Sequence, residues 1–323
     1  MHRRTLFTVA ALAASTLVPM AALAEFPEND IRVIVPWGAG GGTDGIVRKI
    51  TNLAEDNLGD ASMYVENVEG GVSATGIGQV MSARPDGYTI GALTYDSVVT
   101  VPYQNMLPTY SMDKLKLIAR ITSEPDAIIV DATSDYKTIQ DLVDAAKADP
   151  GQIRVAVQNL GGRVHLTLLQ LQDLTGAEFK IVSYPGGAAP QKEAILSDEV
   201  DVALTSLGDF ANLIDDGTVR GILEFSNAKN PTYDVPTSEE AGIDLQNGSF
   251  IVIAAPVDTP PEAISKIETA YKAAYDSEEF QTWVSKIGVT PNWLGSDEVT
   301  QWADETAQSL FTEMDALENT DSK

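Results

Sequence analysis

The sequence has 323 residues, 44% of them hydrophobic and 21% charged, which is typical of a globular chain long enough for two domains. Its 47 Asp and Glu outnumber its 21 Lys and Arg, and a formal net charge of -26 excludes nucleic acid as a main partner and disfavours anionic membrane surfaces. Without cysteine there are no disulfides, thiolate metal sites or cysteine nucleophiles, and two histidines leave little for acid–base or metal chemistry.

Residues 1–24 have the features of an export signal. Arg3 and Arg4 form a positive start, an apolar stretch covers residues 6–20, and Ala22-Leu23-Ala24 is a small-x-small cleavage site. The paired arginines also fit a twin-arginine signal, so both export routes stay open. We expect cleavage after Ala24 and a periplasmic protein with a net charge of 19 − 47 = -28. The alternative is an uncleaved N-terminal anchor.

The first element of the mature chain is a short apolar strand at residues 31–36. A glycine-rich loop follows at residues 38–42, and Thr43-Asp44 are good residues to start a helix. Apolar residues then recur at helical spacing as far as Leu58, before Gly59.

The same order of strand, loop and helix returns three times. It covers strand 153–157, loop 159–162 and helix 164–174; strand 179–183, loop 185–187 and helix 189–196; and strand 200–205, with Gly208-Asp209 opening a segment through residue 214. Strands alternating with helices predict an α/β fold with mostly parallel sheets covered by helices. Each glycine loop then lies where a strand ends and a helix begins, so that unpaired backbone amides and helix dipoles favour an anion there.

Two segments, residues 119–131 and 221–236, have the character of connections between lobes. Two crossings predict a discontinuous first lobe, residues 25–124 and 229–323, and a second lobe, residues 125–228. The end of the chain supports this division, with a strand at 250–256, a helix at 261–275 and a helix start at Ser296.

Several blocks in order resemble the substrate-binding proteins of tripartite tricarboxylate transporters. They are Ile34-Val35-Pro36-Trp37 before Gly40-Gly41-Gly42-Thr43-Asp44; Val65-Glu66-Asn67 with Gly70-Gly71; Arg84 to Thr89; Lys137-Thr138 with Ala146-Lys147 to Gly151; Gly161 to Leu166; Tyr184 to Pro190; and Asp234 to Gly242. The resemblance covers essentially the whole mature chain. It implies a two-lobed periplasmic binding fold, with the ligand cleft between the lobes, that delivers a carboxylate to an integral membrane pump and acts as a monomer.

The resemblance also implies which loops face the ligand, largely through backbone amides, hydroxyls and ordered water. One loop departs from the family pattern: the hydroxyl residues usual before the histidine are absent, and Gln158, Asn159 and Arg163 stand nearby instead. With the residues after the strand at 200–205, the expected ligand-binding residues are Trp37, Gly40, Gly41, Gly42, Thr43, Asp44, Gln158, Asn159, Gly161, Gly162, Arg163, Tyr184, Gly186, Gly187, Ser206 and Asp209.

Some of these residues have two interpretations. Arg163 is either a donor to a second ligand carboxylate or a solvated surface arginine, because a cation at a helix start opposes the helix dipole. Trp37 and Tyr184 either cover the ligand or pack in the core. Residues 40–45 match G-x-G-x-x-G, but export makes a dinucleotide improbable, and we expect no cofactor and no metal.

The functional hypothesis is a non-enzymatic solute-binding protein for a small organic anion, above all a di- or tricarboxylate, that closes about its two crossings. One alternative is an exported hydrolase that uses His165 or an acid pair, although we interpret His165 as a helix-start residue with a local hydrogen bond. The other is a ligand-sensing module for a signalling partner.

Overall fold

The computed structural model describes residues 26–321, except for the side chains of residues 309, 310 and 312–321. Strands and helices alternate over most of the chain, as expected for an α/β protein. The strands are β1 (Ile31–Val35), β2 (Met63–Asn67), β3 (Thr89–Leu93), β4 (Leu115–Asp131), β5 (Arg154–Val157), β6 (Lys180–Ser183), β7 (Val202–Ser206), β8 (Val219–Glu224), β9 (Gly248–Pro256) and β10 (Thr290–Leu294).

The helices lie mostly between successive strands. They are α1 (Gly42–Glu55), α2 (Ala74–Ser82), α3 (Val101–Tyr103), α4 (Ile139–Ala148), α5 (Arg163–Thr175), α6 (Ala188–Leu196), α7 (Ala211–Asp215), α8 (Pro261–Asp276), α9 (Glu278–Lys286) and α10 (Ser296–Asp321), with short turns of other helix types at η1 (Asp96–Thr100), η2 (Met112–Lys114) and η3 (Leu207–Phe210). The predicted end of α5 is confirmed, since Gly176 follows it with a left-handed φ of 70°.

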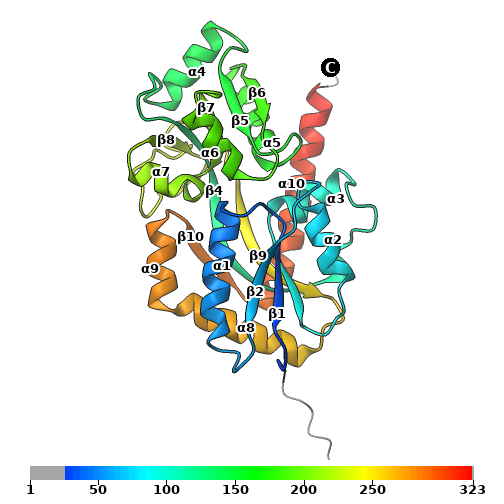
Figure 1. Cartoon of the computed structure of the whole chain (residues 1–323). Coiled ribbons are helices and arrows are strands. Elements are labelled where there is room, and N and C mark those ends of the chain that lie inside the picture. The colour runs from blue at the N-terminus through cyan, green and yellow to red at the C-terminus, as the bar shows by residue number, and fades with distance from the viewer. Residues whose placement is uncertain (1–25, 322–323) are drawn as a thin grey trace, which may run out of the picture.

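The strands form two sheets that share β4, and we call each sheet with its helices a lobe (Figure 1). In the first lobe, β1 pairs in parallel with β2 and β3, whereas β9 runs antiparallel to β3 and β4, and β10 antiparallel to β4. In the second lobe, β5 is parallel to β6 and β7, whereas β4 is antiparallel to β7 and β8. The sheets are therefore mixed rather than mostly parallel, because the segments that pass between the lobes join both sheets against the direction of their neighbours.

The chain passes between the lobes within β4. Residues 115–125 of this strand pair with β9, and residues 126–131 pair with β7 and β8. The return crossing runs beside it, where Asp126 N donates to Asn247 O at 2.9 Å. A Cβ on Gly248 would lie 2.7 Å from Pro125 Cα, so only glycine permits this close approach. The predicted lobe boundaries fall at Pro125 and in the loop after β8, and they remain predictions.

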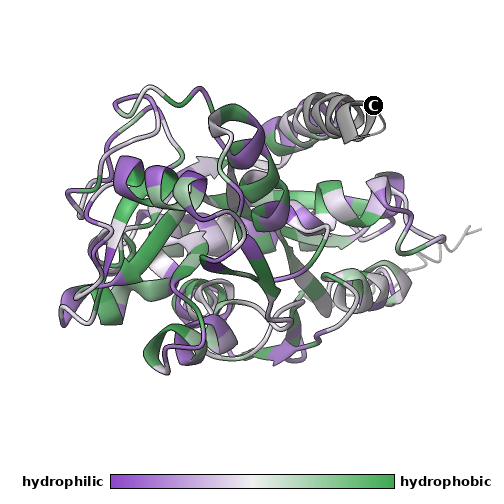
Figure 2. Cartoon of the chain, turned by 90° about the horizontal axis from the view of Figure 1, so that it is seen from above, coloured by the Kyte–Doolittle hydropathy of each residue, from purple (hydrophilic) through white to green (hydrophobic). Residues whose placement is uncertain are grey.

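Helices cover both faces of each sheet. In the first lobe, α1, α8 and α9 bury one face, and α2 and α10 pack on the other. In the second lobe, α4 and α5 cover one face and α6 the other. Figure 2 shows apolar strands inside and many polar residues on the outer helix faces. Along residues 26–321, no helix is long and apolar enough to cross a membrane.

Candidate functional site

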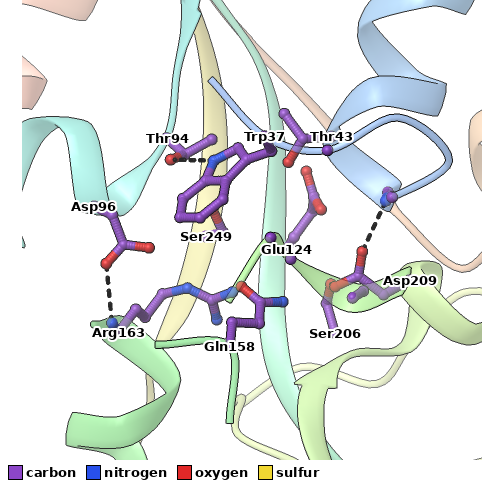
Figure 3. A pocket seen from close by; sticks show the side chains of 16 residues that line it. Trp37, Thr43, Thr94, Asp96, Glu124, Gln158, Arg163, Ser206, Asp209 and Ser249 are labelled. Atoms are coloured by element: carbon purple, nitrogen blue, oxygen red, sulfur yellow. Dashed lines mark hydrogen bonds between the residues drawn. The ribbon is translucent and has the colours of Figure 1, made fainter. Parts of the chain in front are cut away.

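A small cavity of about 30 Å³ lies between the two lobes, where loops from both sheets meet (Figure 3). Most of its lining residues follow the carboxyl end of a strand, the position where open α/β sheets place ligands. The first lobe contributes Trp37, Gly38, Gly41, Gly42, Thr43, Thr94, Asp96, Glu124 and Ser249. The second lobe contributes Gln158, Arg163, Gly186, Gly187, Ala188, Ser206 and Asp209.

Trp37 forms one wall of the cavity directly after β1. Its indole Nε1 donates to Thr94 Oγ1 at 3.1 Å, and the side chain is buried. Beside it, a Cβ on Gly38 would lie 2.8 Å from the carbonyl oxygen of Gly186 in the opposite lobe. The ring is thus buried, as its interpretation as a core residue expects, and it also lines the cavity. That it covers a ligand stays a prediction.

The start of α1 is occupied by a carboxylate from the second lobe. Gly42 N donates to Asp209 Oδ1 at 2.9 Å, and the other oxygen of Asp209 accepts from Thr205 and from Ser206, the latter at 3.1 Å. An anion at a helix start is favoured by the helix dipole and by the unpaired amides. Here the protein itself supplies that anion, across the cleft.

Substituting Gly42 by Ala will therefore separate the lobes at this point. A Cβ there would overlap Asp209 Oδ1 and come within 3.2 Å of its Cγ. Gly45→Ala is the matched control, because a Cβ on Gly45 meets nothing within 4 Å and Ala should stabilise α1 by about 0.5–1 kcal/mol. Small-angle X-ray scattering should give a larger radius of gyration for Gly42→Ala than for Gly45→Ala. Equal radii would contradict the closed contact.

The start of α5 is occupied in the same way, by a carboxylate from the first lobe. Arg163 N donates to Asp96 Oδ1 at 3.0 Å, and Thr100 Oγ1 donates to the same oxygen at 2.7 Å. Burial raises the pKa of Asp96, while the charge of Arg163 and these hydrogen bonds oppose that rise. Two helix starts, one in each lobe, thus receive a carboxylate from the opposite lobe.

Arg163 is buried, with 5% of its surface exposed, so the interpretation as a solvated surface arginine is wrong. Its Nη1 forms an ion pair with Asp126 Oδ1, and Asp126 is fully buried at the crossing of β4 between the lobes. Asp126 Oδ2 also accepts from Thr167 Oγ1 at 2.7 Å. The Nε of Arg163 is buried and has no hydrogen-bond partner among the described residues.

Glu124 extends from β4 toward the cavity from the first lobe (Figure 3). Its Oε1 accepts from Thr122 Oγ1 at 2.7 Å, and 5% of its surface is exposed. Burial raises the pKa of Glu124 to about 7. The hydrogen bond from Thr122 and the charge of Arg163 oppose this rise, whereas the charge of Asp209 adds to it.

The start of α6 contributes open amide groups to the cavity. The N–H groups of Gly187 and Ala188 make no hydrogen bond to any residue within 26–321, and no side chain caps this helix. Both residues line the cavity. The start of α6 therefore keeps two amide donors for a bound molecule, and the N–H of Thr43 at the start of α1 likewise has no partner among the described residues.

The structure brings ten of the predicted ligand-binding residues to the cavity and leaves six outside it. Those at the cavity are Trp37, Gly41, Gly42, Thr43, Gln158, Arg163, Gly186, Gly187, Ser206 and Asp209; those outside are Gly40, Asp44, Asn159, Gly161, Gly162 and Tyr184. Whether any of them binds a ligand stays a prediction.

The six residues outside the cavity mostly hold the loops in place. Asp44 accepts from Gly40 N at 3.0 Å, and also from Arg48 and Asn67. Burial would raise the pKa of Asp44, but these hydrogen bonds outweigh it and lower the pKa.

The other four residues outside the cavity make different contacts. Gly161 O accepts from Gln104 Nε2 at 2.7 Å, and Gly162 N donates to Asn159 O at 3.3 Å. Asn159 itself lines a second pocket, to which Trp37 also contributes. Tyr184 packs against the apolar core under α6.

Sequence reasoning missed Gly38, Thr94, Asp96, Glu124, Ala188 and Ser249, which also line the cavity. Gly38 and Ala188 belong to loops that were identified, and their positions beside predicted residues could have included them. Thr94 and Asp96 follow β3, a strand that the analysis did not single out. Glu124 and Ser249 lie within strands, where no local motif distinguishes a side chain that faces a cavity.

The local interpretation of His165 is confirmed. Its Nδ1 accepts from Gly161 N at 2.9 Å, and partial burial lowers the pKa of the imidazole. It does not line the cavity, and the acid pairs at residues 215–216, 239–240 and 278–279 are exposed. In the part of the chain that the structure describes, no three His, Asp or Glu side chains are grouped so that they could hold a metal ion.

Comparison with known proteins gives matches along nearly the whole chain. The profile of the family described as "Tripartite tricarboxylate transporter family receptor" matches residues 46–312. A protein of Cupriavidus necator, "UPF0065 protein in gbd 5'region", is 28% identical over 316 residues, 95% of each chain. BugT of Bordetella pertussis is 23% identical over 290 residues, covering 86% of this chain and 88% of BugT.

Solved structures share the fold. The periplasmic binding protein BugD superposes with a TM-score of 0.83 at 25% identity, covering 90% of this chain and 98% of BugD. MatC of Rhodopseudomonas palustris, solved with bound malate, gives a TM-score of 0.79 at 22% identity, with coverages of 88% and 98%. Rpa4515 of the same organism, solved with adipate, gives 0.83 at 22% identity, with coverages of 91% and 98%.

Proposed function

Because the chain belongs to the tripartite tricarboxylate transporter receptor family of periplasmic binding proteins, which is not an enzyme family, we propose that it captures a small organic carboxylate and delivers it to a tripartite tricarboxylate-type membrane transporter. The cavity between the lobes is the proposed binding site. Two relatives of the same fold were solved with malate and with adipate, and both of these ligands are dicarboxylates.

The observation that carries this proposal is the set of open donors at the cavity. The amides of Gly187 and Ala188 at the start of α6 have no partner among the described residues, and beside them Arg163, which also lines the cavity, has a buried Nε without a partner. Such donors, directed by a helix dipole and a guanidinium, suit a carboxylate oxygen. We propose that one ligand carboxylate binds here.

The sequence favours a di- or tricarboxylate as the ligand, with hydrogen bonds to it from the backbone amides of several helix starts. In this closed arrangement two of those starts hold Asp209 and Asp96. A second ligand carboxylate at either start would have to displace a carboxylate of the protein.

The proposed location and mode of action follow the family. We propose that the mature chain begins after Ala24, that it acts as a monomer in the periplasm, and that rotation of the lobes about the two crossings admits the ligand. The cleavage site lies outside the described residues.

A ligand panel tests the proposal directly. Thermal and urea unfolding should be followed with mono-, di- and tricarboxylates at millimolar concentration, and with uncharged analogues as controls. A carboxylate present at about 100 times its dissociation constant will raise the free energy of unfolding by about 2.7 kcal/mol and be recovered unchanged. Stabilisation by the uncharged analogues alone, or chemical conversion of the ligand, would contradict the proposal.

A further inference from the structure

The lining of the cavity carries more negative than positive charge. Asp96, Glu124 and Asp209 line it, and Arg163 is its one basic residue, so the side chains sum to 1 − 3 = -2 when all are ionised. The Arg163 guanidinium is moreover paired with a further carboxylate, Asp126, which does not line the cavity. A ligand with two or three negative charges would enter a site that already has an excess of them.

The three lining carboxylates differ in how well they are satisfied. Asp209 accepts from Gly42 N and from two hydroxyls, and Asp96 accepts from Arg163 N and Thr100. Glu124 is nine-tenths buried, yet its single hydrogen bond comes from Thr122 to Oε1. Its Oε2 has no hydrogen-bond or ion-pair partner among the described residues and is not one of the fully buried atoms, so it is open to the cavity. A carboxylate on so buried a side chain is costly to ionise unless a cation or donor joins it.

We propose that the ligand carries a cationic nitrogen as well as its carboxylate, and that Glu124 receives this nitrogen. The inference rests on the proposed function, since it places the carboxylate end of the same ligand at Arg163 and the start of α6. A zwitterionic amino carboxylate then brings each of its charges to an opposite charge or to open donors. Dicarboxylates of equal length leave Glu124 facing a negative group.

An organic ammonium group suits this position better than a metal ion does. In the described chain, no group of three acidic or histidine side chains has the arrangement of a metal site, because Asp96 and Asp209 are each directed to a helix start. An ammonium group needs few acceptors, and Glu124 Oε2 supplies one that is charged.

A matched series of probes tests the proposal. Glutarate, 4-aminobutyrate and 1,3-diaminopropane have the same three-methylene chain and differ in whether each end is a carboxylate or an ammonium. Shorter and longer members of each class extend the series. Isothermal titration calorimetry should show the amino carboxylates binding at least ten times more tightly than the dicarboxylates of equal length.

The outcomes separate this inference from the proposed function. Preference for the dicarboxylates overturns the role of Glu124 and leaves a carboxylate-binding protein. Binding of the diamines alone overturns carboxylate capture. Binding of no member of the three classes overturns both.

Glu124→Gln keeps the size of the side chain and removes its charge. It should weaken binding of 4-aminobutyrate at least tenfold and leave glutarate unchanged or bound more tightly. Glu193→Gln, the same change on the exposed face of α6, is the control and should alter neither. An equal loss for both probes in Glu124→Gln would make Glu124 a structural residue and overturn the proposal.

The pH dependence of the unaltered protein gives a second readout that needs no variant. Arg163 on α5, Asp209 on η3 and Asp96 on η1 face Glu124 across the cavity, and the pKa of Glu124 is raised to about 7. An ammonium group requires the ionised carboxylate, so the affinity for 4-aminobutyrate should rise about tenfold between pH 6 and 8. Affinity for glutarate should fall over the same range. Parallel slopes for the two probes would overturn the proposal.

Discussion

Replacing Arg163 by Met will lower the free energy of unfolding by about 3–5 kcal/mol. Met has a similar length and no charge, so the loss comes mainly from the partners left behind. Asp126 is fully buried and would lose its ion pair, and Asp96 would lose the nearby positive charge that opposes the rise of its pKa. Urea denaturation of the two proteins under identical conditions measures the difference.

Two further variants give this measurement its controls. Arg154→Met removes an arginine from a pair with Asp201 whose side chains are 36% and 31% exposed, and it should cost at most about 1 kcal/mol. The double variant Arg163→Met with Asp126→Leu removes both buried charges and should recover much of the stability lost by Arg163→Met alone. If Arg163→Met costs no more than Arg154→Met, the buried pair does not contribute as we expect.

Glu124→Gln will stabilise the ligand-free protein at pH 8 by up to about 3 kcal/mol and have little effect near pH 4. The pKa of Glu124 is raised from 4.5 to about 7 in the folded protein, so the folded state holds this proton more tightly than the unfolded state does. Stability therefore falls as pH rises from 4.5 to 7, and the whole cost, about 3 kcal/mol, is present above pH 7. Gln has no such charge and avoids that cost.

The test is urea unfolding of both proteins across this pH range. The difference between Glu124→Gln and the unaltered chain should grow from pH 4.5 to 7 and then stay constant. Glu193→Gln should give a flat difference. A constant difference for Glu124→Gln as well would mean that folding does not raise the pKa of Glu124.

Local sequence signals predict the repeated units of the fold well. The apolar run at residues 31–36, the glycines after it and the spacing of Ile46 and Ile50 specify strand, loop and helix within a short segment. The observed β1 and α1 agree with this to within a few residues. Sheet topology predicts that the glycine loops meet at one cavity, the family resemblance implies the same loops, and ten of the predicted residues lie there.

Contacts between distant segments could not be predicted in this way. Gly42 and Asp209 are 167 residues apart, and Asp96 and Arg163 are 67 apart, yet each pair joins the two lobes. No local pattern shows that a helix start will receive a carboxylate from the other lobe. Predicting free amides at α1 and α5 was therefore reasonable from the sequence, and their partners appear only in three dimensions.

The long strand β4 illustrates a second limit. Pro125 lies between two apolar runs, and the sequence predicts a connection between lobes there. The chain does cross there, but within one continuous strand, because Pro125 lies where β4 leaves one sheet and enters the other. Its missing N–H therefore falls at the change of pairing partners.

We expect the proposed opening and closing of the lobes to depend on ionic strength, because each lobe places a carboxylate at a helix start of the other. Separating the lobes replaces the bonds from Gly42 N to Asp209 and from Arg163 N to Asp96 with bonds to water. Hydrogen bonds to charged groups contribute about 1.5–3 kcal/mol each, and dissolved salt screens their charges once water enters the gap. The chain thus supplies its own counter-anions at both helix starts, and we expect the balance between the proposed shut and open forms to shift with the salinity of the surrounding fluid.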